Sequence, residues 1–72
     1  MNERHDQVRA LARLARTQSR LSVQYRHWSA EAQLAGKLDA CHRWAKEAAR
    51  YRLNAQWAIW QAQLTKDNHY GA

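Results

Sequence analysis

Apolar positions in the second half of the chain predict a helix with a narrow seam. Between Cys41 and Leu64, small and aromatic residues recur at alternating steps of three and four. This spacing places them in one stripe along a helix, as at a contact between two helices. The stripe consists of Cys41, Trp44, Ala48, Tyr51, Ala55, Ala58 and Ala62. Because most of these residues are alanine, we expect a neighbouring helix to approach closely.

The same segment carries a second apolar stripe on the opposite side of the predicted helix, made of Leu53, Trp57, Trp60 and Leu64. Exposed clusters of this kind mark interaction sites, and tryptophan is favoured at the energetic centre of interfaces. We therefore expect the first stripe to pack within the chain and the second to form an interface with a second copy. A different protein target, or coverage by the chain's own first helix, are the alternatives.

The first half of the chain predicts a helix from about residue 2 to residue 35. Asn2 is a suitable N-cap, and Glu3 and Asp6 in the first turn suit the helix dipole. The predicted seam consists of Leu11, Leu14, Gln18, Leu21, Tyr25, Trp28, Ala32 and Ala35. Gln18 is its only polar member, and it either fixes the register of pairing or is a half-exposed residue without that role.

Gly36 is the only glycine before Gly71, and the chain has no proline. It stands where a helix-ending glycine is expected. Carrying the seam of the first helix past Gly36 would bring polar residues such as Asp39 into it, which disfavours the alternative of one continuous helix of about 60 residues in a long coiled coil. The sequence predicts a turn over residues 36–38, a helix over 39–64 with Asp39 as N-cap or first-turn acid, and a frayed tail over 65–72.

These elements predict an all-α fold, an antiparallel two-helix hairpin forming a single domain. Residue i should face roughly residue 73 minus i, so that Tyr25 meets Ala48 and Leu14 meets Ala58 and Ile59. A chain of 72 residues buries little surface and usually needs disulfides, metals or association. The single cysteine, Cys41, excludes an intrachain disulfide. We therefore expect a homodimer that forms a four-helix bundle.

Positive charge is concentrated in the first predicted helix. The net charge is +6, and five arginines but no acid occur between Gln7 and Ala30. Neighbouring like charges on a helix cost about 0.2–0.5 kcal/mol each, and an anionic partner would turn that cost into attraction. The three interpretations are nucleic-acid backbone binding, an acidic protein partner, and a solvated face that only aids solubility. The candidate contacts are Arg9, Arg13, Arg16, Arg20 and Arg26.

No residue pattern is typical of catalysis or of metal binding. The histidines His5, His27, His42 and His69 are scattered, and none is expected to pair with a carboxylate one helical turn away. The serines Ser19, Ser22 and Ser29 lie mid-helix without a neighbouring base. We expect no enzymatic activity, no metal and no cofactor. No apolar run reaches the roughly 18–20 residues of a membrane span, so we expect a soluble, cytoplasmic protein.

The sequence favours a small, non-enzymatic, self-associating basic protein that holds the backbone of DNA or RNA through its arginines, with little reading of bases. The alternative is a protein-interaction module, an inhibitor or adaptor of the kind encoded by phages or plasmids, which docks through Trp57 and Trp60.

Overall fold

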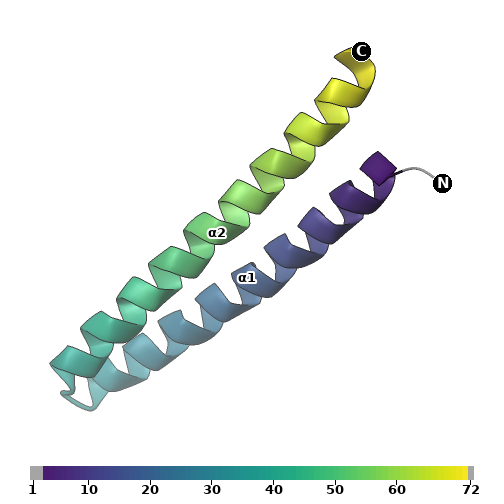
Figure 1. The fold of residues 1–72 in the computed structure, drawn as a ribbon. Coiled ribbons are helices and arrows are strands. Elements are labelled where there is room, and N and C mark those ends of the chain that lie inside the picture. The colour runs from purple at the N-terminus through teal and green to yellow at the C-terminus, as the bar shows by residue number, and fades with distance from the viewer. Residues whose placement is uncertain (1–2, 72) are drawn as a thin grey trace.

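The computed structural model of the chain is a hairpin of two long helices (Figure 1). Helix α1 spans Glu3–Leu34 and helix α2 spans Leu38–Gly71. The structure describes the backbone over residues 3–71 and the side-chain environments over residues 3–67. Over that described backbone there is no strand, so the predicted all-α antiparallel hairpin is confirmed and the single long helix is excluded.

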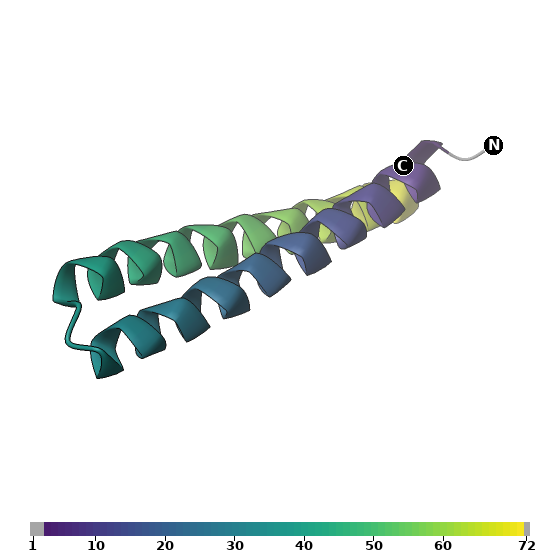
Figure 2. The same ribbon diagram turned by 90° about the horizontal axis from the view of Figure 1, so that it is seen from below.

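The hairpin is long and thin. Its Cα atoms extend over 55 × 19 × 11 Å, and the radius of gyration is 16.3 Å, where a compact chain of this length has about 11 Å. Figure 1 shows the helices side by side towards the chain ends, whereas Figure 2 shows them overlapping there and separated at the turn. The two helices therefore wind gently around each other, as a seven-residue seam requires.

Gly36 ends α1 in the predicted way. Its φ of 74° is left-handed, and the backbone N–H of Gly36 donates to the carbonyl of Gln33 at 3.0 Å. The N–H of Lys37 donates to the carbonyl of Ala32 at 2.8 Å, which completes a Schellman motif. The N–H of Cys41 then donates to the carbonyl of Lys37 at 2.9 Å. Lys37 therefore takes the N-cap position, and Asp39 is a first-turn acid.

At the open end of the hairpin, the C-terminal end of α2 differs from the prediction. The predicted N-cap, Asn2, lies outside the described residues. The frayed tail predicted over 65–72 is wrong over 65–71, because α2 continues to Gly71, and residue 72 lies outside the described residues. The hydroxyl of Thr65 donates to the carbonyl of Gln61 at 2.8 Å, and Gln63 donates to Asp67 at 3.2 Å. No glycine or proline interrupts this part of the chain, so an established helix propagates through it.

The predicted seam is confirmed on α2, where Ala48, Ala55 and Ala58 are buried, Ala58 completely. On α1, the buried residue lies one position after Leu14, Leu21 and Trp28 of the predicted seam, and the predicted seam residue Ala35 is exposed. Leu14 and Trp28 are 40% and 39% exposed. The buried positions of α1 are Ala15, Ser22, Ser29 and Ala32. In each of these three adjacent pairs on α1, as at Leu14 and Ala15, the small residue is the buried one. The alanines of α2 let the two backbones approach closely, and a leucine between them would hold them apart.

Two hydrogen bonds from serine hydroxyls of α1 to backbone carbonyls of α2 show that the helices approach closely. Ser22 Oγ donates to the carbonyl of Ala48 at 2.8 Å, and Ser29 Oγ donates to the carbonyl of Cys41 at 2.9 Å.

The predicted register, in which residue i faces roughly residue 73 minus i, fits other contacts between the helices. The Tyr25 ring packs on Trp44 and Tyr51, which flank its predicted partner Ala48, and Asn54 donates a hydrogen bond to Gln18. Leu14 and Ile59, which were predicted to meet, are 40% and 57% exposed and lie outside the buried core.

Among the described side chains, every buried residue is an alanine or a serine. The accessible surface is 5831 Å², about 1,200 Å² more than the roughly 4,650 Å² expected for a compact protein of 8.5 kDa. A lone hairpin therefore leaves exposed an area of the size that a dimer usually buries on each partner.

Candidate interaction surfaces on the two broad sides of the hairpin

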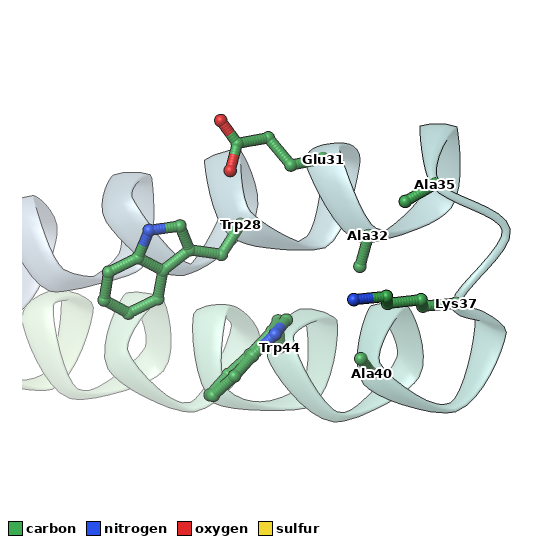
Figure 3. Close-up of a pocket in the computed structure, with 7 residues that line it drawn as sticks. All are labelled: Trp28, Glu31, Ala32, Ala35, Lys37, Ala40 and Trp44. Atoms are coloured by element: carbon green, nitrogen blue, oxygen red, sulfur yellow. The ribbon is translucent and has the colours of Figure 1, made fainter.

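The hairpin has two broad sides, and three surface grooves between α1 and α2 distinguish them. The largest of these three lies next to the turn, has a volume of about 540 Å³, and is shown in Figure 3. It is lined by Trp28, Glu31, Ala32, Ala35, Lys37, Ala40 and Trp44. Figure 3 shows Trp28 of α1 and Trp44 of α2 together at one end, with the Lys37 side chain extended along the space between the helices.

A second groove, of about 380 Å³, lies nearer the chain ends and is lined by Gln7, Ala10, Leu11, Trp57, Gln61 and Thr65. Residues separated by multiples of seven occupy nearly the same position around a helix. Ala10 and Glu31 are related in this way on α1, as are Ala40 and Gln61 on α2. Both grooves therefore open on one side of the hairpin, which we call the aromatic side.

Four rings pack together beside the turn groove. The Tyr25 ring lies 5.2 Å from Trp28, 5.5 Å from Trp44 and 5.3 Å from Tyr51, measured between centroids, and it stacks on Tyr51 at an interplanar angle of 8°. Trp28 and Trp44 are 5.7 Å apart. Because three of these four pairs cross between the helices, the cluster joins α1 to α2, and each such pair contributes about 0.5–1.5 kcal/mol beyond its buried area.

Arg50 closes the outer edge of this cluster. Its guanidinium carbon lies 5.1 Å from the Tyr51 ring centroid, and its Nη2 donates to the Tyr51 hydroxyl at 3.3 Å. The same nitrogen lies 3.0 Å from a carboxylate oxygen of Glu47. The hydrogen bond to Tyr51, followed by the Glu47 charge, raises the pKa of Arg50 above its ordinary value. Arg50 is therefore engaged within the hairpin, unlike the five candidate arginines of α1.

The third groove, of about 230 Å³, opens on the opposite side, which we call the basic side. It is lined by Ser22, Arg26, Ala45, Ala48, Ala49 and Arg52. Arg26 comes from α1 and Arg52 from α2, so two guanidinium groups border one groove with an alanine floor. Sequence reasoning included Arg26 but left Arg52 out of the candidate site. The sequence shows that Arg52 flanks the seam residue Tyr51, but its place across the groove from Arg26 is visible only once the partner helix is placed.

The five candidate arginines are all exposed, but they do not form a single stripe. Arg13 and Arg20 each precede a buried residue by two positions, which places them about 160° away, on the outer edge of α1. Arg9 and Arg16 lie between this edge and Arg26. Among the described side chains, none of the five guanidinium groups, nor that of Arg52, has an ion-pair or hydrogen-bond partner.

The acidic residues lie away from the basic side. Glu31 lines the turn groove on the aromatic side, and Glu47 shares the helix position of Ala40 on the same side. The seven-residue spacing places the remaining acids. On α1, Glu3 has the same position around the helix as Glu31, and Asp6 has the same position as Arg13. On α2, Asp39 and Asp67 have the same position as Trp60, on the outer edge of the helix. The charges are thus segregated: over residues 3–67, the basic side carries cations without acids.

One histidine differs from the prediction. His27 Nε2 lies 3.0 Å from Glu31 Oε1, four residues along the same helix, so the expectation that no histidine pairs with a carboxylate is wrong. Both side chains are more than half exposed, and a pair of this kind contributes little. In the part of the chain whose side chains are described, no group of three histidine, cysteine or acidic residues could hold a metal ion.

The predicted interface stripe is exposed in the hairpin. Leu53, Trp57 and Trp60 are 60%, 54% and 58% exposed, and Leu64 is 37% exposed. Coverage by the chain's own first helix is therefore excluded. No charged residue occurs from Leu53 to Thr65, so this part of α2 is uncharged around its whole circumference.

The structure also brings out residues that sequence reasoning missed. Ser22 and Ser29 were considered only as possible nucleophiles, which lack a neighbouring base, yet both donate hydrogen bonds from α1 to α2. The available signal was their seven-residue spacing with Ala15, which marks a row of small residues.

No helix within residues 3–71 is long and apolar enough to cross a membrane. Comparisons with protein-family models, curated proteins and solved structures found no match. The functional conclusion therefore comes from the chain's own residues.

Proposed function

We propose that this chain is a small, non-enzymatic, self-associating protein that binds the backbone of nucleic acid through the arginines of α1. The observation that carries the proposal is a set of five exposed guanidinium groups that have no partner among the described side chains, in a stretch of sequence that contains no acid. A helix that needed only solubility would place a carboxylate among them, because each neighbouring like-charge pair costs about 0.2–0.5 kcal/mol.

Arginine suits phosphate because its planar fork donates two parallel hydrogen bonds to one phosphate group. The chain presents these groups on a helix surface, without an element shaped to enter a groove and read base edges. Binding should therefore depend weakly on sequence and strongly on salt. Four phosphate contacts correspond to a slope of about −3 to −4 in log affinity against log salt concentration.

Self-association is supported by the excess surface and by the stripe of Leu53, Trp57, Trp60 and Leu64. We propose that a second copy covers this stripe and that the two hairpins form a four-helix bundle. Stable dimers bury about 600–1,000 Å² on each partner, which is close to the excess area of this hairpin. Sedimentation equilibrium should give about twice the chain mass of 8.5 kDa.

Fluorescence anisotropy with a labelled duplex, in rising salt, tests nucleic-acid binding. The test variant replaces Arg9, Arg16 and Arg26 by alanine, and the matched control replaces Lys37, Arg43 and Lys46 by alanine. Both variants lower the net charge from +6 to +3. We expect the first to lose at least about tenfold in affinity and about three units of salt slope, and the second to change several times less.

Two results would contradict the proposal. If the unchanged protein does not bind at about 50 mM salt, where phosphate contacts are strong, nucleic acid is not its ligand. If both variants lose affinity equally, the net charge of the protein determines binding, and the arginines of α1 do not form the binding surface.

A second candidate function is supported by the tryptophans. Trp57 and Trp60 are more than half exposed on an uncharged surface, and tryptophan is favoured at interface hot spots. A protein-interaction module would use this stripe for a different protein target. In that case changing Trp57 and Trp60 to alanine abolishes target capture without changing the mass of the unbound protein, and the arginine variants have little effect.

A further inference from the structure

We propose that duplex DNA lies along the basic side of the hairpin, and that Arg26 of α1 and Arg52 of α2 hold one phosphate group between them. The inference rests on the proposed function, and it moves the binding surface from the outer edge of α1 to the broad side that both helices form. It adds Arg52 to the site and assigns Arg13 and Arg20 a minor part.

The groove between the helices has the composition that such a site needs. Arg26 and Arg52 border it, and its floor consists of Ala45, Ala48 and Ala49. The remaining lining residue, Ser22, is already committed, because its hydroxyl donates to the carbonyl of Ala48 at 2.8 Å. Small side chains allow a phosphate to approach closely, and the two guanidinium groups are then the polar side chains available to meet it.

The charges on this side reinforce one another. Arg9, Arg16 and Lys66 lie at neighbouring helix positions on the basic side, whereas the acids occupy the aromatic side and the outer edges. Uncompensated charge of one sign produces a strong local potential that attracts a polyanion. By comparison, Arg13 and Arg20 share the outer edge of α1 with Asp6, at the same helix position.

The distribution of aromatic rings favours duplex over single-stranded nucleic acid. Proteins that bind single strands stack unpaired bases on aromatic side chains. In this hairpin the described rings lie on the aromatic side or on the outer edge of α2, and none lines the groove between Arg26 and Arg52. A basic surface without rings can hold phosphates, and it offers no platform for bases.

DNA is favoured over duplex RNA by the same groove. Proteins recognise RNA duplexes partly through hydrogen bonds to 2′-hydroxyl groups. The alanine floor supplies no side chain for that contact, so the recognition here is of phosphate alone.

The inference also agrees with self-association. The stripe proposed as the dimer interface lies on the outer edge of α2 and towards the aromatic side, where Trp57 borders a groove. A dimer built on that stripe leaves the basic side of each hairpin open.

The test compares two variants that remove the same charge. R26A/R52A changes the groove, and R13A/R20A changes the outer edge; both leave a net charge of +4. The probe is a labelled DNA duplex of about 16 base pairs, which matches the 55 Å length of the hairpin. We expect R26A/R52A to lose about 30-fold or more in affinity and, because one phosphate contact is lost, about one unit of salt slope, and R13A/R20A to lose less than about threefold in affinity.

R26K/R52K keeps the charge and removes the forks, so it should fall between the unchanged protein and R26A/R52A. Circular dichroism checks that each variant remains helical, which we expect because all four arginines are exposed. Equal losses in the two alanine variants, or a larger loss in R13A/R20A, would overturn the groove as the site while leaving backbone binding intact. A complete lack of DNA binding by the unchanged protein would end both proposals, and equal or tighter binding of an RNA duplex or a single strand would overturn the assignment to duplex DNA.

Discussion

The half of the hairpin next to the turn and the half next to the chain ends are held together by different means. In the turn half, residues 20–52, a Schellman motif, two serine cross-links and a cluster of four rings join the helices. In the open half, residues 3–19 and 53–71, buried alanines form the contact, together with an exposed hydrogen bond from Asn54 to Gln18 at 3.2 Å. The turn half therefore contains its own specific contacts, and the open half depends on small residues.

This difference explains where the chain needs a partner. Burying an alanine removes little apolar area from water, so an alanine seam allows close packing but contributes modest stability. The large apolar side chains of the open half, including Trp57 and Trp60, point elsewhere and remain exposed. A second copy that covers them would stabilise the half that the chain itself stabilises least.

The largest effect should come from enlarging the seam of the open half. Ala58 is completely buried, and Ala58→Leu would force the helices apart. We expect a loss of about 3 kcal/mol in the free energy of unfolding, at the upper end of the usual cost of overpacking. Urea unfolding followed by circular dichroism measures it, at one fixed protein concentration because association contributes to stability.

Ala49→Leu is the matched control, because Ala49 is an exposed alanine on the same helix. It should change the stability by less than about 0.5 kcal/mol. A tolerated leucine at position 58 would mean that the open half is not closely packed, and the comparison between the two halves would fail.

The same small-residue seam shows how far sequence reasoning reached. The helices, the turn at Gly36 and the seam of α2 followed from spacing alone, because each depends on the local order of residues. The seam of α1 did not, since Leu14 and Ala15 fit the period equally well, and the choice between them depends on how closely α2 approaches. The site divides in the same way: the arginines of α1 were visible in the sequence, but the pairing of Arg26 with Arg52 requires the second helix.

The next largest effect concerns the turn half. Tyr25 contacts three rings, and Tyr25→Leu keeps an apolar side chain but removes all three contacts. We expect a loss of about 2 kcal/mol in the free energy of unfolding. Hydrogen exchange should show the loss of protection over residues 20–52 first, and an equal loss over both halves would mean that they unfold as one unit.

A smaller effect on stability is expected from the hydrogen bonds of Ser22 and Ser29 between the helices. Ser22→Ala removes a buried hydrogen bond while keeping a small residue in the seam, so it should cost about 1 kcal/mol. Ser22→Val adds bulk at the same position and should cost more, about 2 kcal/mol. Ser19→Ala, at an exposed position on the same helix, serves as the control in the same unfolding measurement. If Ser22→Val were as stable as Ser22→Ala, the helices would not approach as closely at this point as the 2.8 Å bond indicates.

The smallest effect should come from Gln18, the polar residue in the seam of the open half. Its side chain accepts the bond from Asn54, but that bond is exposed, so water replaces it at little cost. Gln18→Leu should therefore change the free energy of unfolding by less than about 0.5 kcal/mol and leave the mass in solution unchanged. A residue that fixes register behaves differently, because its replacement by leucine gives a more stable protein with more than one assembly. A change of mass in Gln18→Leu would show that this residue specifies the pairing of the open half, and that alanine packing alone does not.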